Sequence, residues 1–157
     1  MKLLAAIKND TNHQAAFTLI ELMMALVIIS ILAMLAQASY SSIMTNMRNN
    51  KAISDLYLID VQIERFNTIN FTLPEDLSTL DIPLDPWGNA YVYLSFVSLE
   101  GNGKQRKDHN LVPLNTDYDL YSSGPDGQSV SPLTAKASRD DIIRANNGGY
   151  VGTATDY

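Results

Sequence analysis

Hydrophobic and polar positions divide this 157-residue chain into two unlike parts. Residues 17–38 read FTLIELMMALVIISILAMLAQA and are almost wholly apolar. At about 1.5 Å per residue, roughly 22 helical residues cover about 33 Å, enough to cross the hydrocarbon core of a bilayer. The pattern predicts a membrane-spanning helix at 17–38, followed by a polar, turn-rich region.

The helical pattern continues beyond the apolar segment. No Pro or Gly occurs from residue 39 to residue 70, and apolar residues recur there at spacings of three or four. Such a stripe is typical of the buried face of a helix. We therefore expect a single helix of roughly fifty residues, whose second half packs on a C-terminal domain. The stripe consists of Ala52, Leu56, Ile59, Ile63 and Phe66.

Two short segments further along have the composition of β-strands. Tyr91-Val92-Tyr93-Leu94 follows a turn with the sequence DPWGN, and residues 118–122 read YDLYS before a second Gly-rich turn. Aromatic and β-branched residues between turn signals favour strands. The predicted fold is therefore α+β: a long N-terminal hydrophobic helix packed on a small antiparallel β-sheet domain with a loop-rich C-terminus.

Between these strands, residues 100–110 (EGNGKQRKDHN) have the composition of an exposed loop. We interpret the basic cluster Lys104, Arg106 and Lys107 as a solvated hairpin tip rather than a binding patch. His109 stands alone in this loop, so a metal or catalytic role for it is disfavoured.

The distribution of charge orients the apolar segment in a membrane. Lys2 and Lys8 precede the segment, and no Lys or Arg follows until Arg48. The positive-inside tendency places the N-terminus in the cytoplasm and the C-terminal domain on the other side. Two ordinary interpretations remain at this point: a secretory signal cleaved near Ala36, Ala38 or Ser39, and a plain signal anchor.

Glu21 argues against both, because an ionised carboxylate in a lipid-facing helix is costly unless it finds a partner. It is the fifth residue counted from Phe17. If the chain is cut before Phe17, the new α-amino group of a neighbouring subunit can neutralise Glu21 inside a bundle of helices. The carboxylate would then fix the stagger of packed subunits.

The residues around this position resemble a known processing signal. Ala16 followed by Phe17-Thr18-Leu19-Ile20-Glu21-Leu22 resembles the N-terminal signal of type IV pilins and of type II secretion pseudopilins. The resemblance implies cleavage between Ala16 and Phe17 by a prepilin peptidase, and N-methylation of Phe17. This chain has Ala16 where the family usually has Gly, and Ala38 where many members have a helix-kinking Pro.

Acidic residues near the C-terminus suggest an ion site. Asp126 lies in a Gly-flanked turn, and Asp140 and Asp141 are adjacent. Hard cations such as Ca²⁺ favour several oxygen ligands in loops. From spacing alone, Ser138 and Asp141 equally suit the capping box of a short helix.

A second resemblance bears on this choice. The DPWGN turn, the segment DLYSSGPDG and the later DDI resemble the globular domain of the major pseudopilin of type II secretion. The resemblance implies a Ca²⁺ ion held by the Ser123 carbonyl and the carboxylates of Asp126, Asp140 and Asp141. The loop at 128–139 and the tail at 145–157 are longer than the family pattern.

Composition excludes several functional classes. The formal net charge is −6 and the isoelectric point is near 4.7, which argues against a nucleic-acid groove. The chain has no Cys, so disulfides, thiol catalysis and Cys-ligated zinc are excluded. No Ser/His/Asp set, phosphate loop or His-metal spacing indicates an enzyme.

These observations predict a structural subunit in three parts. Residues 1–16 are a cleaved leader, 17–38 a transmembrane and filament-core helix, and 39–157 a periplasmic domain that includes the second half of the helix. We expect a single-pass protein of the bacterial inner membrane that forms a homopolymeric pseudopilus. The expected partners are further copies of the chain, minor pseudopilins, prepilin peptidase and an inner-membrane assembly platform. The alternatives are a type IV pilin of a surface pilus and, from a different class, a membrane-anchored binding module.

Overall fold

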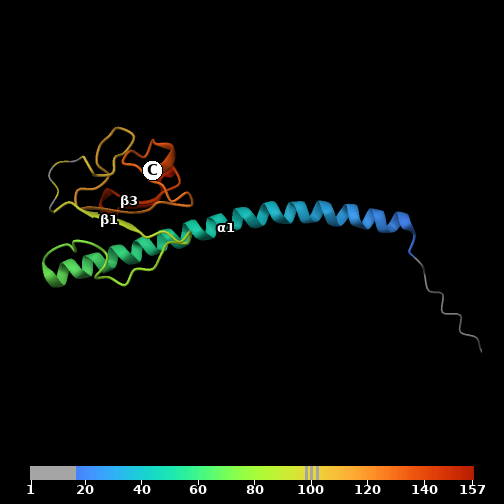
Figure 1. The fold of residues 1–157 in the computed structure, drawn as a ribbon, viewed down its shortest axis with the longest axis horizontal. Coiled ribbons are helices and arrows are strands. Elements are labelled where there is room, and N and C mark those ends of the chain that lie inside the picture. The colour runs from blue at the N-terminus through green and yellow to red at the C-terminus, as the bar shows by residue number, and fades with distance from the viewer. Residues whose placement is uncertain (1–16, 98, 100, 102) are drawn as a thin grey trace, which may run out of the picture. The chain divides into compact units, whose positions relative to one another are not determined.

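The computed structural model of this chain describes residues 17–97, 99, 101 and 103–157. A long helix, α1, runs from Leu19 to Asn70 and is followed by short strands (Figure 1). The strands are β1 (Val92–Ser95), β2 (Tyr118–Ser122), β3 (Ile142–Ala145) and β4 (Tyr150–Thr153). The predicted leader at 1–16, including Ala16 of the predicted cleavage site, lies outside the described residues.

The chain divides between Ser41 and Ser42 into two compact units, so that α1 contributes to both. In the described residues, the N-terminal unit consists of Phe17, Thr18 and the apolar first half of α1. The C-terminal unit contains the rest of α1 and all four strands. The predicted domain boundary at 38/39 falls a few residues before this division.

The four strands form one antiparallel sheet in the order β1-β2-β3-β4. Its register pairs Tyr93 with Leu120, Tyr121 with Ile143, and Ile143 with Gly152. Single 3-10 turns at Lys136–Ser138, Asn146–Gly148 and Ala154–Asp156 precede or follow the last two strands. Short antiparallel strands of this kind are stable only when a face is covered.

Both faces of the sheet carry a core. On one face, the stripe of α1 packs against alternate residues of the strands, as neighbouring strand residues point to opposite sides. This core comprises Ala52, Leu56, Ile59, Ile63, Tyr91, Tyr118, Leu120 and Ile142, and Phe66 of the predicted stripe is half-buried. The opposite face carries a second core of Leu114, Leu133, Ile143, Ala145 and Ala154. The predicted α+β fold, a long N-terminal helix with a small antiparallel sheet, is confirmed.

The sequence patterns predict β1 to within one residue and β2 at its observed bounds, but they do not predict β3 or β4. The alternative of a short helix beginning at Ser138 is wrong. The Ser138 hydroxyl donates to the Val130 carbonyl at 2.7 Å and accepts from the Val130 N–H at 2.9 Å, and the chain enters β3 at Ile142. The tail, expected as an extension, supplies β4.

Candidate functional site

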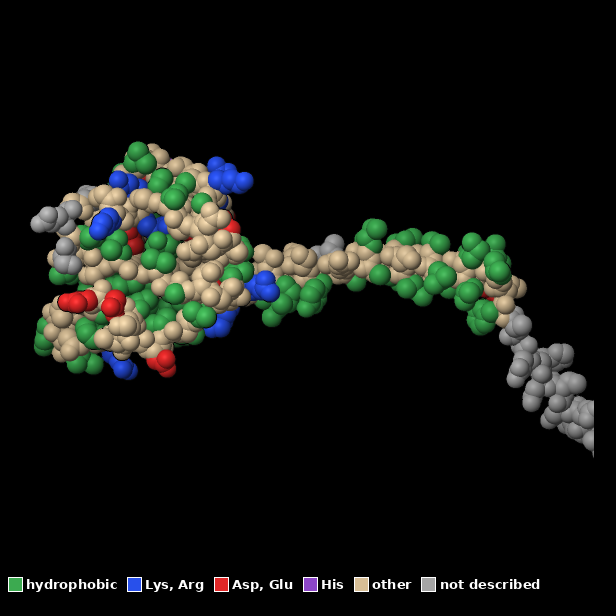
Figure 2. All heavy atoms as spheres, in the orientation of Figure 1, with side chains coloured by type: hydrophobic (Ala, Val, Ile, Leu, Met, Phe, Trp, Pro, Cys, Tyr) green, Lys and Arg blue, Asp and Glu red, His purple; other side chains and the backbone are tan. Residues whose placement is uncertain are grey.

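The first half of α1 presents its apolar side chains to the outside on every side. An 18-residue window of this helix has a mean hydropathy of 2.7 with none of it buried, so its length and composition suit a membrane span. Phe17, just before the helix, is 83% exposed. Figure 2 shows hydrophobic side chains along this half of α1, and among the described residues every Lys and Arg belongs to the C-terminal unit. Exposure of such an apolar surface to water is unfavourable, so this surface is expected to contact lipid or other apolar helices.

Glu21 is the sole charged residue between residues 17 and 47. Within its own chain, its side chain caps the N-terminus of α1. Its Oε2 accepts hydrogen bonds from the Thr18 N–H at 2.9 Å and the Thr18 hydroxyl at 2.8 Å. The Glu21 N–H in turn donates to the Thr18 hydroxyl at 3.3 Å. This is a capping box, which the spacing Thr-x-x-Glu indicates from sequence and which the sequence reasoning missed. One carboxylate oxygen, Oε2, accepts both bonds from Thr18, the second residue after the predicted cut.

The DPWGN turn lies against the end of β2 through Asp85. The Asp85 Oδ1 atom accepts the backbone N–H groups of Trp87 at 3.0 Å and Asn89 at 2.7 Å, and Oδ2 accepts the Ser122 hydroxyl at 2.6 Å. The Asn89 amide donates to the Gly124 carbonyl at 3.1 Å. Two of the three segments that carry the second resemblance, DPWGN and DLYSSGPDG, are therefore in direct contact.

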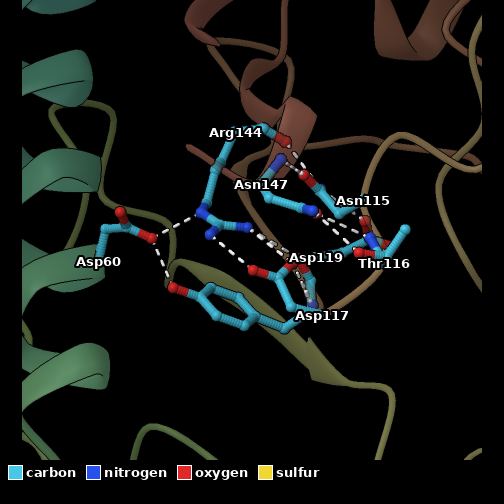
Figure 3. Close-up of polar contacts among 8 residues, drawn as sticks. Asp60, Asn115, Thr116, Asp117, Asp119, Arg144 and Asn147 are labelled. Carbon is cyan, nitrogen blue, oxygen red and sulfur yellow. Dashed lines mark hydrogen bonds and ion pairs between the residues drawn. The ribbon is translucent and has the colours of Figure 1, made fainter. Parts of the chain in front are cut away.

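A buried arginine joins α1 to the sheet. The Arg144 guanidinium lies 2.5 Å from Asp60 on α1 and binds Asp117 with two nitrogens, at 2.8 and 2.9 Å (Figure 3). It also stacks on the Tyr118 ring, 4.0 Å from the centroid. Burial tends to lower the pKa of Arg144, but the surrounding carboxylates outweigh it and the pKa is raised. Burial and the hydrogen bond to Asp60 raise the pKa of the Tyr118 hydroxyl.

A second buried arginine, Arg106, lies on the opposite face of the sheet. The predicted solvated hairpin tip is wrong for Arg106, whereas Lys104 is exposed and Lys107 half-buried. Arg106 is 4% exposed, because its guanidinium binds Asp141 at 2.6 Å and the Ser129 hydroxyl, and stacks on the Tyr121 ring. Its backbone N–H donates to the Asp119 carboxylate at 2.6 Å. Burial is the main cause that raises the pKa of both Asp119 and Asp141.

The predicted calcium ligands do not share one environment. Asp126 is exposed, Ser123 and Asp140 are half-buried, and Asp141 is fully buried against Arg106. Asp126 and Asp140 are in contact, with the Asp126 N–H 3.4 Å from an Asp140 carboxylate oxygen. Within the described residues, no three Asp, Glu or His side chains come together as a metal site. Calcium binding stays a prediction, and the contacts of Asp141 speak against it.

Comparisons with known proteins bear on both units. A family described as "Prokaryotic N-terminal methylation motif" matches residues 11–36, which include Ala16, Phe17 and Glu21. The type II secretion system core protein G of Escherichia coli K12 is 26% identical over a 141-residue alignment that covers 75% of this chain and 86% of the relative. The protein of the same name from Pseudomonas aeruginosa is 28% identical, over 74% of this chain and 87% of the relative. No solved structure matches the chain significantly.

The two kinds of match agree with the geometry described above. The motif covers the capping box and the start of the apolar helix. The alignments with core protein G extend over most of the chain and therefore include much of the C-terminal unit. The predicted resemblance to type IV pilin-like proteins, and among these to the major pseudopilin of type II secretion, is thus confirmed.

Proposed function

We propose that this chain is a structural subunit of a type II secretion pseudopilus. The observation that carries the proposal is the exposed apolar half of α1, with Glu21 as its sole charge at the fifth position from Phe17. The similarity to type II secretion system core protein G supports it. No catalytic activity is expected of such a subunit.

Processing by a prepilin peptidase would create the assembly-competent form. Cleavage between Ala16 and Phe17, followed by N-methylation of Phe17, leaves the whole of α1 on the mature protein. Phe17 precedes the helix and is exposed, as a peptidase substrate requires. The matched methylation motif supports both steps.

Polymerisation would then transfer the apolar helix from lipid to the centre of a filament. Both environments are apolar, so the transfer exchanges lipid contacts for contacts between helices of neighbouring copies. Glu21 favours the filament over the membrane. Its carboxylate is costly when unpaired in an apolar medium, and in the filament it can pair with the α-amino group of a neighbouring subunit's Phe17. The partners of this process are further copies of the chain, minor pseudopilins, the peptidase and an inner-membrane assembly platform.

The location that goes with this function is the bacterial inner membrane, crossed once, with residues 39–157 in the periplasm. A type IV pilin of a surface pilus would share the processing and the helix. The lack of Cys favours the pseudopilus, because many type IV pilins close their C-terminal loop with a disulfide. A membrane-anchored binding module would use the basic residues at 104–107 or the C-terminal tail, and the burial of Arg106 removes one of the three basic side chains from such a surface.

Determination of the mature N-terminus tests the processing step. We expect N-methylated phenylalanine at Phe17, found by mass spectrometry of protein purified from the membrane of its host. A mature protein that begins near Ser39 would instead identify a conventional secretory signal. Deletion of the gene separates the two filaments: loss of secreted proteins indicates the pseudopilus, and loss of twitching or adhesion indicates a surface pilus.

A further inference from the structure

Arg106 holds three parts of the C-terminal unit together. Its Nη2 atom donates to the Asp141 carboxylate at 2.6 Å, and Nη1 donates to the Ser129 hydroxyl. The same hydroxyl donates to Asp141 at 2.7 Å, so guanidinium, hydroxyl and carboxylate form a closed triangle. The guanidinium lies 4.1 Å from the centroid of the Tyr121 ring on β2.

The backbone of the same residue is also fixed. The Arg106 N–H donates to the Asp119 carboxylate at 2.6 Å, and its carbonyl accepts the Leu114 N–H at 2.9 Å. The loop around residue 106 is therefore tied to β2 by its backbone. Its side chain ties it to the 123–141 loop, which is the loop that the resemblance assigns to a calcium ion.

The polar atoms around Asp141 fit a guanidinium and not a second cation. Asp141 is fully buried, and its Oδ2 already accepts two hydrogen bonds. Two buried atoms of this pair lack a hydrogen-bond partner within the described residues: Arg106 Nε, a donor, and Asp141 Oδ1, an acceptor. They complement each other, since a guanidinium binds a carboxylate through two parallel N–H groups. A calcium ion on Asp141 would instead lie beside a buried positive charge. Calcium prefers six to eight oxygen ligands, and within the described residues no three carboxylates come together to supply them.

We propose that the Arg106 guanidinium is the built-in cation of this loop, in the role that the resemblance assigns to calcium, so that the folded C-terminal unit requires no metal ion. A covalently attached cation is always present and is independent of the calcium concentration outside the inner membrane. The longer 128–139 loop supplies Ser129, which completes the triangle with Asp141.

Thermal unfolding of the full chain in detergent tests this proposal. Trp87 is the only tryptophan and packs against the core of the C-terminal unit, so its fluorescence reports on that unit alone. We expect the same unfolding midpoint in millimolar calcium chloride, in magnesium chloride and in EGTA. Because a ligand that binds only the folded state raises the midpoint, a rise with calcium that magnesium does not reproduce would overturn the proposal.

Substitution provides the second arm of the test. Arg106→Met leaves the buried carboxylate of Asp141 without its partner, and we expect the midpoint to fall by at least about 10 °C. Lys104→Met removes a charge from an exposed position of the same loop and should leave the midpoint unchanged. If Arg106→Met does not fold, Arg106→Lys replaces it in the comparison with Lys104→Met. Arg106→Lys keeps the positive charge but loses the planar guanidinium. Equal midpoints for the Arg106 and Lys104 variants would contradict the proposal.

Discussion

Arg144 on β3 forms an ion pair with Asp60 on α1, with 2.5 Å between Nε and Oδ1. The same guanidinium binds both oxygens of Asp117, which precedes β2. One buried side chain thus fixes the helix, the entry to the second strand and the third strand to one another. The unit has no cysteine, so this ion pair connects its elements without the disulfides that many exported domains use.

The Arg144→Met substitution should strongly destabilise the C-terminal unit. It leaves the carboxylates of Asp60 and Asp117 without their shared partner, and the loss of one member of a buried ion pair costs about 3–5 kcal/mol. Denaturant unfolding of the full chain in detergent, followed by Trp87 fluorescence, measures this loss. Arg139→Met is the matched control, because Arg139 is exposed. Equal unfolding free energies for the two variants would refute the role of Arg144.

Gly124 should not tolerate a side chain. Its φ is +63°, a left-handed conformation, and a Cβ atom added there would lie 2.3 Å from the Asp140 carbonyl oxygen. The left-handed conformation alone costs a residue with a side chain about 1–2 kcal/mol, and the close approach adds to that cost. We therefore expect Gly124→Ala to lower the unfolding free energy by more than about 2 kcal/mol.

Gly103 is the control for this substitution, since a Cβ atom there meets no atom within 4 Å. Gly103→Ala should change the unfolding free energy by less than about 0.5 kcal/mol. A Gly124→Ala variant that unfolds at the same denaturant concentration as Gly103→Ala would show that the turn before Asp126 can move away from Asp140.

The elements that could be predicted are those in which the spacing of apolar residues, or the turn residues on either side, indicates one kind of secondary structure. The stripe of α1 has helical spacing and a solvated opposite face, and β2 lies between clear turn signals. In β3, by contrast, all four residues are buried, so polar and apolar positions do not alternate. The buried Arg144 within it and the preceding Asp141 suggest a solvated segment, which is why the strand escapes prediction.

The two arginine clusters were also beyond the reach of sequence reasoning. Arg106 pairs with Asp141, and Arg144 with Asp60, and nothing local to either arginine indicates its partner. A charged residue in a Gly-rich loop is usually solvated, and only the folded chain shows that Arg106 is not. The capping box at Thr18 and Glu21, in contrast, is local and can be read directly from its spacing.

Stability should fall in alkaline solution because of two buried tyrosines. Burial raises the pKa of Tyr91 and of Tyr118, and in each case a hydrogen bond to an aspartate adds to the effect. Above about pH 10, the hydroxyl groups of Tyr91 and Tyr118 lose their protons in the unfolded chain but keep them in the folded chain. The unfolded state then binds fewer protons, so stability decreases as pH rises, by about 1.4 kcal/mol per pH unit for each tyrosine.

Denaturant midpoints between neutral pH and about pH 11 measure this slope. The double variant Tyr91→Phe and Tyr118→Phe should lose most of it, because phenylalanine has no proton to release. Tyr57→Phe, at an exposed position of α1, should keep it. An unchanged alkaline slope in the double variant would assign the loss of stability to other groups.

The charge of Glu21 can be separated from its capping role by two substitutions. Glu21→Gln retains a side chain that accepts the hydrogen bonds of Thr18, since the capping box accommodates Glu or Gln, but removes the charge. Glu21→Ala removes both. If Glu21 pairs with the α-amino group of a neighbouring subunit, both variants are cleaved before Phe17 and neither forms filaments.

The readouts are the mature N-terminus and the recovery of filaments by sedimentation after overexpression with the assembly machinery. Thr18→Ala is the complementary variant: it removes the hydroxyl of the capping box, a loss of about 0.5–2 kcal/mol of helix stability, while the carboxylate remains. We expect it to assemble. Filament formation by Glu21→Gln but not by Glu21→Ala would mean that the helix start, and not the charge, is what assembly requires. Glu21 is the sole charged residue in the apolar half of α1, and its pairing with the α-amino group of Phe17 is proposed to offset the cost of burying its carboxylate. That result would show that assembly does not depend on this pairing.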